Sequence, residues 1–427
     1  MSALSVVATG DSFITRRIVA GPQTEALAAR LGGAEVCFTN FEMLTPCGEG
    51  FPNAESGGTW ACGPAEVADD LRALGFNMVA WANNHTLDYS YGGLAATQRE
   101  LARAGLVAAG VGATLAEAAA PRYLETPAGR VALIGACASF HGTDRAGNQR
   151  PDQRGRPGLN PLRHTSTWLL PREELASLAA MAAACGINAR FETRVRAGFA
   201  RPPEPGVVLF GEHRFREGPA GVHTEPHPGD LARLRTAIAD ARRQAEFVLV
   251  SLHAHEQRGG VLAEPAEFVE TACRAFIEAG ADAVIGHGPH VLRGIEIYQG
   301  RPIFYSLGNF FFQNETIENL PSDYFEALGL DLAASTADGL DARTANNTRG
   351  FITTPWAWKS VLARFTVEGG RLTGCELHPV DLSDAHRARR GTPRLSDEAA
   401  ILDHLAELCA PYGTHLEIAG GMARIAL

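Results

Sequence analysis

Lysine is almost missing from this chain of 427 residues. Lys359 is the only one, and arginine supplies the rest of the positive side-chain charge. A mechanism that forms a Schiff base would depend on that single amine, so a pyridoxal cofactor is not expected. Basic residues are also fewer than acidic ones, 38 against 48, which gives a formal net charge of −10. The sequence therefore argues against a surface that binds nucleic acid.

Long apolar runs and closely paired cysteines are absent as well. No run approaches the roughly 20 residues that cross a bilayer, and residues 1–7 lack the basic start of a signal peptide. The eight cysteines form no C-x-x-C pair and mostly lie in apolar runs, as buried free thiols do. We therefore expect a cytoplasmic protein without a membrane anchor. Its oligomeric state does not follow from the sequence.

What the chain has is an alternation of strand and helix patterns. With 45% hydrophobic residues it can fill a large core. Short apolar runs that predict strands alternate with patterns of helical period, and the alternation resumes over 230–305. The predicted strands and helices of the first part are 6–9, 23–31, 36–41, 64–74, 77–82 and 93–104. This order predicts an α/β fold.

Two long segments interrupt the alternation. Residues 141–228 are rich in Arg, Pro and Gly and contain one helical pattern at 172–185, whereas residues 313–357 are polar. Both segments begin and end beside predicted strand ends that carry candidate ligands, so we expect them to form walls over a site. Disordered surface insertions are the alternative. We predict that residues 1–427 form one domain with these two insertions.

Polar clusters follow five of the predicted strands. They are Gly10-Asp11, Asn40-Phe41-Glu42, Asn83-Asn84-His85 with Asp88, His253-Ala254-His255-Glu256, and His287-Gly288-Pro289-His290. A strand that ends in Gly and presents imidazoles or carboxylates is suited to deliver metal ligands. These clusters predict a single site at the strand ends.

Several of these side chains have more than one reasonable role. Asp11 can bind a hard cation, serve as a base or cap a turn. His253 and His255 are two residues apart, so an extended backbone points them to opposite faces and only one enters the site. His287 and His290 bracket a Gly-Pro turn that can direct both rings to one cation. Arg293 is a candidate anion clamp, and Ser306 and Asn309 are candidates for orienting groups.

These motifs, in this order, resemble the CapA-type family of poly-γ-glutamate biosynthesis proteins within the calcineurin-like metallophosphoesterase fold. The resemblance covers most of 3–140 and 228–312 and the strands near 358–380. It is carried by Asn83-Asn84-His85 with Asp88, by the GHGPH stretch at 286–290, and by the YSLGNF stretch at 305–310. It implies a four-layer α/β/β/α sandwich with divalent metal at the carboxyl ends of the strands.

The resemblance also implies roles for individual residues. Glu42 corresponds to an oxygen ligand, Asn84 to a metal ligand and His85 to a group that acts on the substrate, with Asp88 orienting His85. The family usually has His-Trp-Gly at this point, and its histidine aligns with His253. His255 has no counterpart in that motif and is a candidate for substrate contact. The expected metal ligands are Asp11, Glu42, Asn84, His253, His287 and His290.

The mixed nitrogen and oxygen ligands favour Mn²⁺, Zn²⁺, Fe²⁺ or Co²⁺ over Mg²⁺ or Ca²⁺, with one or two ions bound. Trp356 and Trp358, at the end of the second insertion, are candidates to pack against a substrate side chain, and core packing is the alternative.

Three reactions compete. The fold suggests a phosphoesterase, but Asp11-Ser12-Phe13 replaces the usual Asp-x-His. The CapA resemblance suggests hydrolysis of a peptide or γ-glutamyl amide. The same motifs are similar to a lasso-peptide epimerase, which implies proton abstraction at Cα by Asp11 with His85 or His290. We rank the epimerase first because no anchor is evident and His255 departs from the capsule pattern. A peptide or small-molecule amide is then the substrate, and a non-catalytic binding protein ranks last.

Overall fold

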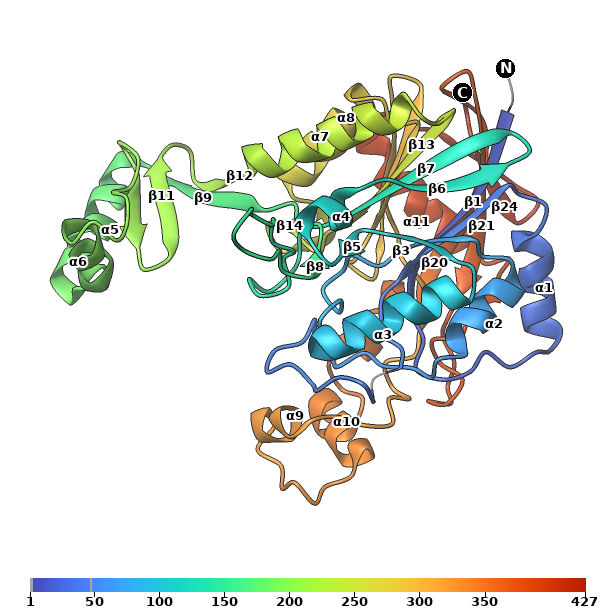
Figure 1. The fold of residues 1–427 in the computed structure, drawn as a ribbon, viewed down its shortest axis with the longest axis horizontal. Coiled ribbons are helices and arrows are strands. Elements are labelled where there is room, and N and C mark those ends of the chain that lie inside the picture. The colour runs from blue at the N-terminus through green and yellow to red at the C-terminus, as the bar shows by residue number, and fades with distance from the viewer. Residues whose placement is uncertain (1–2, 47) are drawn as a thin grey trace.

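The computed structural model describes residues 3–46 and 48–427, and in this part of the chain two large β-sheets lie face to face (Figure 1). In the first sheet β1 is central and runs parallel to β2 and β19 but antiparallel to β20. Its strands, in spatial order, are β23 (Leu416–Ala419), β24 (Met422–Ile425), β21 (Arg371–Asp381), β20 (Lys359–Glu368), β1 (Ala3–Phe13), β2 (Val36–Phe41), β3 (Met78–Ala80) and β4 (Val107–Ala109). Off this path, β19 (Asn309–Phe312) pairs with β1 and β22 (Arg394–Leu395) with β21.

The second sheet has parallel strands at its centre. β13 runs parallel to β7 and to β16, and β16 runs parallel to β18. The spatial order is β17 (Leu292–Tyr298), β18 (Arg301–Leu307), β16 (Ala283–His287), β13 (Phe247–His253), β7 (Gly129–Cys137) and β6 (Arg122–Thr126). Every residue of β13 and β16 is buried. Burial on both faces explains why these strands are continuous apolar runs without alternation.

Helices cover the outer faces of both sheets (Figure 1). The helices over the first sheet are α1 (Pro22–Leu31), α2 (Val67–Leu74) and α3 (Ser90–Arg103), and those over the second are α7 (Pro228–Arg242) and α8 (Glu267–Glu278). α11 (Ala399–Cys409) packs beside β17. Between the sheets lies a core that includes Val6, Phe38, Leu249, Ile285 and Phe365. The predicted α/β/β/α sandwich is confirmed.

The remaining short elements connect these layers. They are β5 (Val111–Gly112), α4 (Leu115–Ala119), β8 (Gly158–Leu159), β14 (Gln257–Arg258), β15 (Val261–Pro265) and η3 (Ala410–Tyr412).

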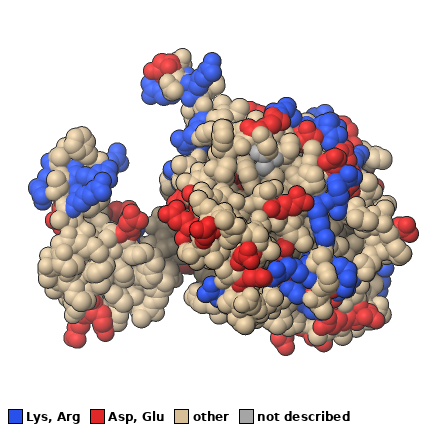
Figure 2. All heavy atoms as spheres, turned by 90° about the horizontal axis from the view of Figure 1, so that it is seen from below, with Lys and Arg blue, Asp and Glu red and all other residues tan. Residues whose placement is uncertain are grey.

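Residues 164–226, the larger part of the first insertion, form a protruding lobe, whereas its start stays against the body, where His141 Nε2 lies 3.0 Å from the Ser56 carbonyl. The lobe contains β9 (His164–Leu170), α5 (Arg172–Cys185), α6 (Ala189–Arg196), β10 (Val208–Phe210), β11 (His213–Glu217) and β12 (Gly221–Pro226). The helix predicted at 172–185 is confirmed as α5. Figures 1 and 2 show the lobe standing apart from the rest of the molecule, and His164 stacks on Phe268 of α8 at its base, with ring centroids 4.3 Å apart. The lobe does not form the predicted wall, because β9 and β12 lead the chain outward.

The second insertion stays beside the strand ends. It contains α9 (Ser322–Ala327), α10 (Thr336–Thr344), η1 (Gly350–Thr353) and η2 (Pro355–Trp358). Phe351 lies edge-on to the ring of His290, with centroids 5.1 Å apart, so this segment does border the predicted site. The assignment of residues 1–427 to one domain stays a prediction.

Neither the membrane nor the cysteine prediction is tested in full. Within the described residues, no helix combines the length and the apolar character that a membrane span requires. The free cysteines found there include buried Cys37 and Cys137 and exposed Cys185. Cys62, however, is disulfide-bonded. The prediction that the thiols stay free is therefore wrong at Cys62, and because disulfides are uncommon in reducing compartments the cytoplasmic location stays a prediction.

Candidate metal centre

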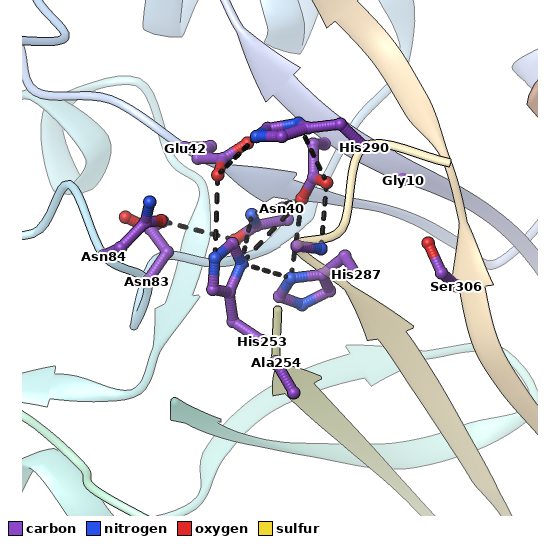
Figure 3. Close-up of polar contacts among 12 residues, drawn as sticks. Gly10, Asn40, Glu42, Asn83, Asn84, His253, Ala254, His287, His290 and Ser306 are labelled. Atoms are coloured by element: carbon purple, nitrogen blue, oxygen red, sulfur yellow. Dashed lines mark hydrogen bonds and ion pairs between the residues drawn. The ribbon is translucent and has the colours of Figure 1, made fainter. Parts of the chain in front are cut away.

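Five strands bring predicted site residues and their neighbours to one edge of the sandwich. In the first sheet Asp11 of β1 is paired with Asn40 of β2 and with Asn309 of β19. In the second sheet His253 of β13 is paired with His287 of β16. Figure 3 shows side chains from the two sheets turned toward one another across this edge.

Asp11, His253 and His287 form a first donor group, one of two such groups found among the described residues, with ligand atoms within 4.8 Å of one another. Asp11 Oδ1 lies 3.9 Å from His253 Nδ1 and 3.6 Å from His287 Nδ1. The two Nδ1 atoms are only 2.9 Å apart. Ser251 Oγ, 2.5 Å from His287 Nε2, fixes that ring with Nδ1 toward the group.

Glu42, His255 and His290 form the second donor group. His290 Nε2 lies 3.9 Å from Glu42 Oε1, and its Nδ1 lies 2.8 Å from the Asn309 side-chain oxygen, which directs Nε2 into the site. His290 itself has a φ of 60°, a left-handed conformation that follows the Gly-Pro turn and brings its ring back toward the site.

The position of His255 corrects the strand argument. We expected it to face away from His253, yet the Nε2 atoms of the two rings are 3.1 Å apart. β13 ends at His253, so the alternation of an extended strand no longer applies two residues later. His255 therefore joins the possible metal ligands.

His253 lies between the two donor groups. Its Nδ1 faces Asp11 and His287, while its Nε2 is 3.6 Å from Glu42 Oε1 and close to His255. A neutral imidazole has one lone pair and one N–H, so His253 ligates one ion at a time in that form.

Orphaned acceptors show that the site fits a cation. Among the described residues, neither carboxylate oxygen of buried Glu42 has a hydrogen-bond partner, and the side-chain oxygen of Asn84 lacks one as well. Buried acceptors without partners are costly, and a metal ion would satisfy them. Both residues were predicted ligands.

The pKa shifts of the site residues also favour a bound cation. Burial raises the pKa of Asp11 to about 7, against hydrogen bonds from Asn40 and Gly288 and the charge of His85, which lower it. Burial, with the charges of Asp11 and Asp88, raises the pKa of Glu42. Burial also lowers the pKa of each neighbouring imidazole: His253, His255, His287 (to about 3) and His290 (to about 4). Neutral imidazoles beside carboxylates that lack a counter-charge suit a divalent ion.

His85 and Asp88 form a dyad outside both donor groups. His85 Nδ1 lies 2.6 Å from Asp88 Oδ2. Asp88 also accepts hydrogen bonds from the backbone N–H groups of Gly57 at 3.0 Å and Ala61 at 2.8 Å. Held as an acceptor, Asp88 is placed to orient the His85 ring and leaves Nε2 outside this bond; the action of His85 on a substrate stays a prediction.

Arg293 is not placed as an anion clamp. Its buried guanidinium donates hydrogen bonds to the carbonyls of Leu262, Ala254, His255 and Glu256, at 3.0–3.1 Å. Four of its five N–H donors are thus directed to backbone carbonyls rather than to a ligand. Arg293 fixes the turn that carries His255.

We expect Arg293→Met to destabilise the protein by roughly 3 kcal/mol or more, because each buried acceptor left without a donor costs about 1–3 kcal/mol. Metal content should also fall, since the turn that holds His255 is released. Urea unfolding and elemental analysis measure the two effects. Arg424→Met is the control, because its exposed pair with Glu376 should contribute within about 0.5 kcal/mol. Equal stability of the two variants would contradict this role.

The two tryptophans lie outside the donor groups. Trp356 stacks on His404 with ring centroids 3.9 Å apart, away from the site. Trp358 is buried, and its Nε1 donates to the Phe351 carbonyl at 3.0 Å. Core packing therefore accounts for Trp358, which also supports Phe351 beside His290, whereas Trp356 is half-buried and lies outside the core clusters.

Sequence reasoning missed several residues of the site. Asn40 Nδ2 donates to Asp11 Oδ1 at 2.8 Å, and Asn83 Nδ2 donates to Asn40 Oδ1 at 3.3 Å. The Gly288 N–H donates to Asp11 Oδ2 at 2.9 Å. All three lie inside the quoted clusters, so their position was a signal that went unused. Arg343 and Phe351, in the second insertion, carried no motif.

Comparison with known proteins agrees with this geometry. The family model described as "Bacterial capsule synthesis protein PGA_cap" matches residues 5–314. Two uncharacterized proteins of Sinorhizobium fredii, y4sH and y4uA, are each 34% identical over 443 residues, covering 98% of this chain and 92% of theirs. The PGA biosynthesis protein CapA of Bacillus subtilis is 40% identical over 85 residues, covering 20% of this chain and 22% of CapA. A probable polyglutamine synthesis accessory protein of Mycobacterium tuberculosis is 28% identical over 289 residues, covering 67% of this chain and 58% of its own.

Proposed function

Because this chain belongs to the bacterial capsule synthesis protein PGA_cap family, we propose that it is a metal-dependent acid/base enzyme that acts beside a carbonyl of a peptide or related amide. The observation that carries this proposal is the His85–Asp88 dyad, which stands beside the two donor groups but belongs to neither. Acid/base chemistry beside a carbonyl needs a group that transfers a proton and a nearby positive charge that stabilises the carbonyl oxygen.

The donor groups define where metal would be held. Asp11, His253 and His287 would hold one ion, and Glu42, His255 and His290, with the orphaned oxygen of Asn84 available, would hold a second. A bound divalent ion would supply the positive charge that polarises a carbonyl oxygen or acidifies a water molecule. The mixed ligands favour Mn²⁺, Zn²⁺, Fe²⁺ or Co²⁺.

Epimerisation at Cα is the reaction that we favour. It needs one group to remove a proton from one face and another to return a proton on the opposite face, and Asp11 and His85 come from different strand ends. His290 Nδ1 is engaged by the Asn309 side-chain oxygen at 2.8 Å, and its ring belongs to the second donor group, so a bound ion would occupy the remaining nitrogen. This supports His85, rather than His290, as the partner of Asp11.

Hydrolysis of a peptide or γ-glutamyl amide is the second candidate. Two donor groups that meet at His253 favour it, because paired ions suit the activation of water. Both oxygens of Asp11 already accept hydrogen bonds, which suits a ligand better than a base. His85 would then protonate the leaving group.

Incubation with peptides in D₂O, followed by mass spectrometry, distinguishes the reactions. We expect the metal-loaded protein to introduce one deuterium without cleavage into a suitable peptide, because Cα–H exchange accompanies epimerisation. Cleavage with uptake of water would instead support hydrolysis. The probes are N-acetylated tripeptides that end in Trp, Phe or Glu and γ-glutamyl dipeptides, and EDTA-treated protein is the control. Activity that survives exhaustive chelation would contradict the proposal.

A further inference from the structure

An apolar cavity adjoins the donor groups on the side of His290. Its volume is about 470 Å³, and its lining includes Phe312, Leu340, Phe351 and Trp358. The rings of Phe312 and Phe351 are 4.7 and 5.1 Å from the ring of His290, so these two lining residues place the cavity next to the second donor group. A volume of this order accommodates a large side chain.

Arg343 of α10 lies at the boundary between the cavity and the site. It lines the cavity, and its guanidinium donates a hydrogen bond to the hydroxyl of Thr59. Thr59 belongs to the loop whose Gly57 and Ala61 N–H groups bind Asp88. Arg343 shares the cavity with Phe351, whose ring lies 5.1 Å from the ring of His290. The guanidinium therefore contacts the loop that holds the dyad, and the cavity that it lines adjoins His290.

The charge of Arg343 is not balanced. Across residues 3–46 and 48–427, Arg343 forms no ion pair with a carboxylate, whereas Arg390, beside the same segment, pairs with Glu315 at 2.7 Å. Arg349 also lines the cavity, but it donates to the carbonyls of Ala342 and Arg343 at the end of α10. Among the described residues Arg349 forms no ion pair either, but its N–H groups are used on these carbonyls, so Arg343 is the cavity arginine with N–H donors left for a ligand.

We infer that Arg343 and this cavity form the substrate subsite, in which Arg343 binds a free α-carboxylate and the cavity receives the apolar side chain of the same residue. A guanidinium binds a carboxylate through two parallel hydrogen bonds. An apolar side chain gains from burial in the neighbouring cavity. The substrate class is then a peptide that ends in a large apolar residue. Binding of such a peptide does not depend on the proposed function. Only the reaction that would follow binding rests on it.

Calorimetry with one peptide in two forms tests the subsite. The probe is N-acetyl-Ala-Ala-Phe, as the free acid and as the C-terminal amide, titrated into the full-length protein both chelated and loaded with Mn²⁺. We expect the acid to bind about tenfold tighter or more, the scale of a charged hydrogen-bonded contact. Arg343→Gln should remove most of this preference in both preparations, which separates Arg343 from binding of the carboxylate to metal.

Two further variants keep the test specific. Arg349→Gln removes a positive charge from the same cavity and should keep the acid preference. Phe351→Ala should weaken the acid and the amide alike, because it removes apolar contact and no charge. Circular dichroism and the thermal unfolding midpoint check that each variant is folded.

The outcomes separate this inference from the proposed function. Equal affinity for acid and amide in the unmodified protein, an intact preference in Arg343→Gln, or equal loss in Arg349→Gln would each overturn the subsite. A preference that depends on Arg343, in a protein that neither exchanges nor cleaves any peptide, would support the subsite and refute the enzyme. Turnover without a preference for the acid would support the enzyme and refute the subsite.

Discussion

Asp11→Asn is expected to lower turnover by about 100-fold or more, the scale for loss of a positioned acid or base. The side-chain oxygen that remains can still accept the Gly288 N–H or face the metal, so the fold and most of the metal should persist. His85→Ala should show a similar loss. If the two residues address opposite faces of Cα, each variant should lose deuterium exchange from one stereoisomer more than from the other.

Asp282→Asn is the matched control for Asp11→Asn. Asp282 is also buried, but it pairs with Arg242 at 2.6 Å and accepts the Val248 N–H at 2.8 Å, outside the donor groups. This variant should lose stability and keep its turnover per folded molecule. Full activity of Asp11→Asn would remove Asp11 from catalysis, and symmetric loss of the two stereoisomers would favour hydrolysis.

His253→Ala is expected to weaken metal binding chiefly in the first donor group, because a neutral imidazole has one lone pair and His253 belongs to the group of Asp11 and His287. Its Nδ1 faces that group, and its Nε2 faces the second. The loss of affinity should exceed the roughly 10–100-fold that follows removal of a supporting partner of a ligand. Elemental analysis after dialysis against a graded series of Mn²⁺ concentrations measures the change.

His287→Ala and His255→Ala are the comparisons for His253→Ala. Each belongs to one donor group, so each should lower occupancy at one position and leave the other. Equal loss in all three variants would mean that the two positions fill only together. Unchanged metal content in His255→Ala would mean that the ring serves the substrate instead, as the sequence resemblance first implied.

The sandwich and most of the donor residues were predictable because local patterns specify them. Nearly continuous apolar runs such as 247–252 predict buried parallel strands. The carboxyl ends of parallel strands lie at the same edge of their sheet. Asp11, His253 and His287 follow those runs directly. Their convergence also requires the two sheets to pack face to face, because Asp11 lies in the first sheet and both histidines lie in the second.

The site residues that were misplaced or missed depend on where a strand ends or on contacts between segments far apart in the sequence. His255 was misplaced because the period of two was extended beyond the end of β13. Arg293 carries a charge that suggests a ligand, and only the tertiary structure shows that its donors are used on backbone carbonyls. Arg343 meets Thr59 across 284 positions of the chain, and no local pattern predicts such a contact.

Each donor group draws its carboxylate from the first sheet and its imidazoles from the second. Asp11 lies in β1 and Glu42 follows β2, whereas His253 and His287 end β13 and β16, and His255 and His290 come after them. An ion bound in either group would therefore act as a crosslink between the halves of the sandwich. Ligand binding of this kind adds to the free energy of unfolding in proportion to the logarithm of free ion concentration. The thermal midpoint of this protein would then report metal availability, and the two sheets would separate most easily when the metal is scarce.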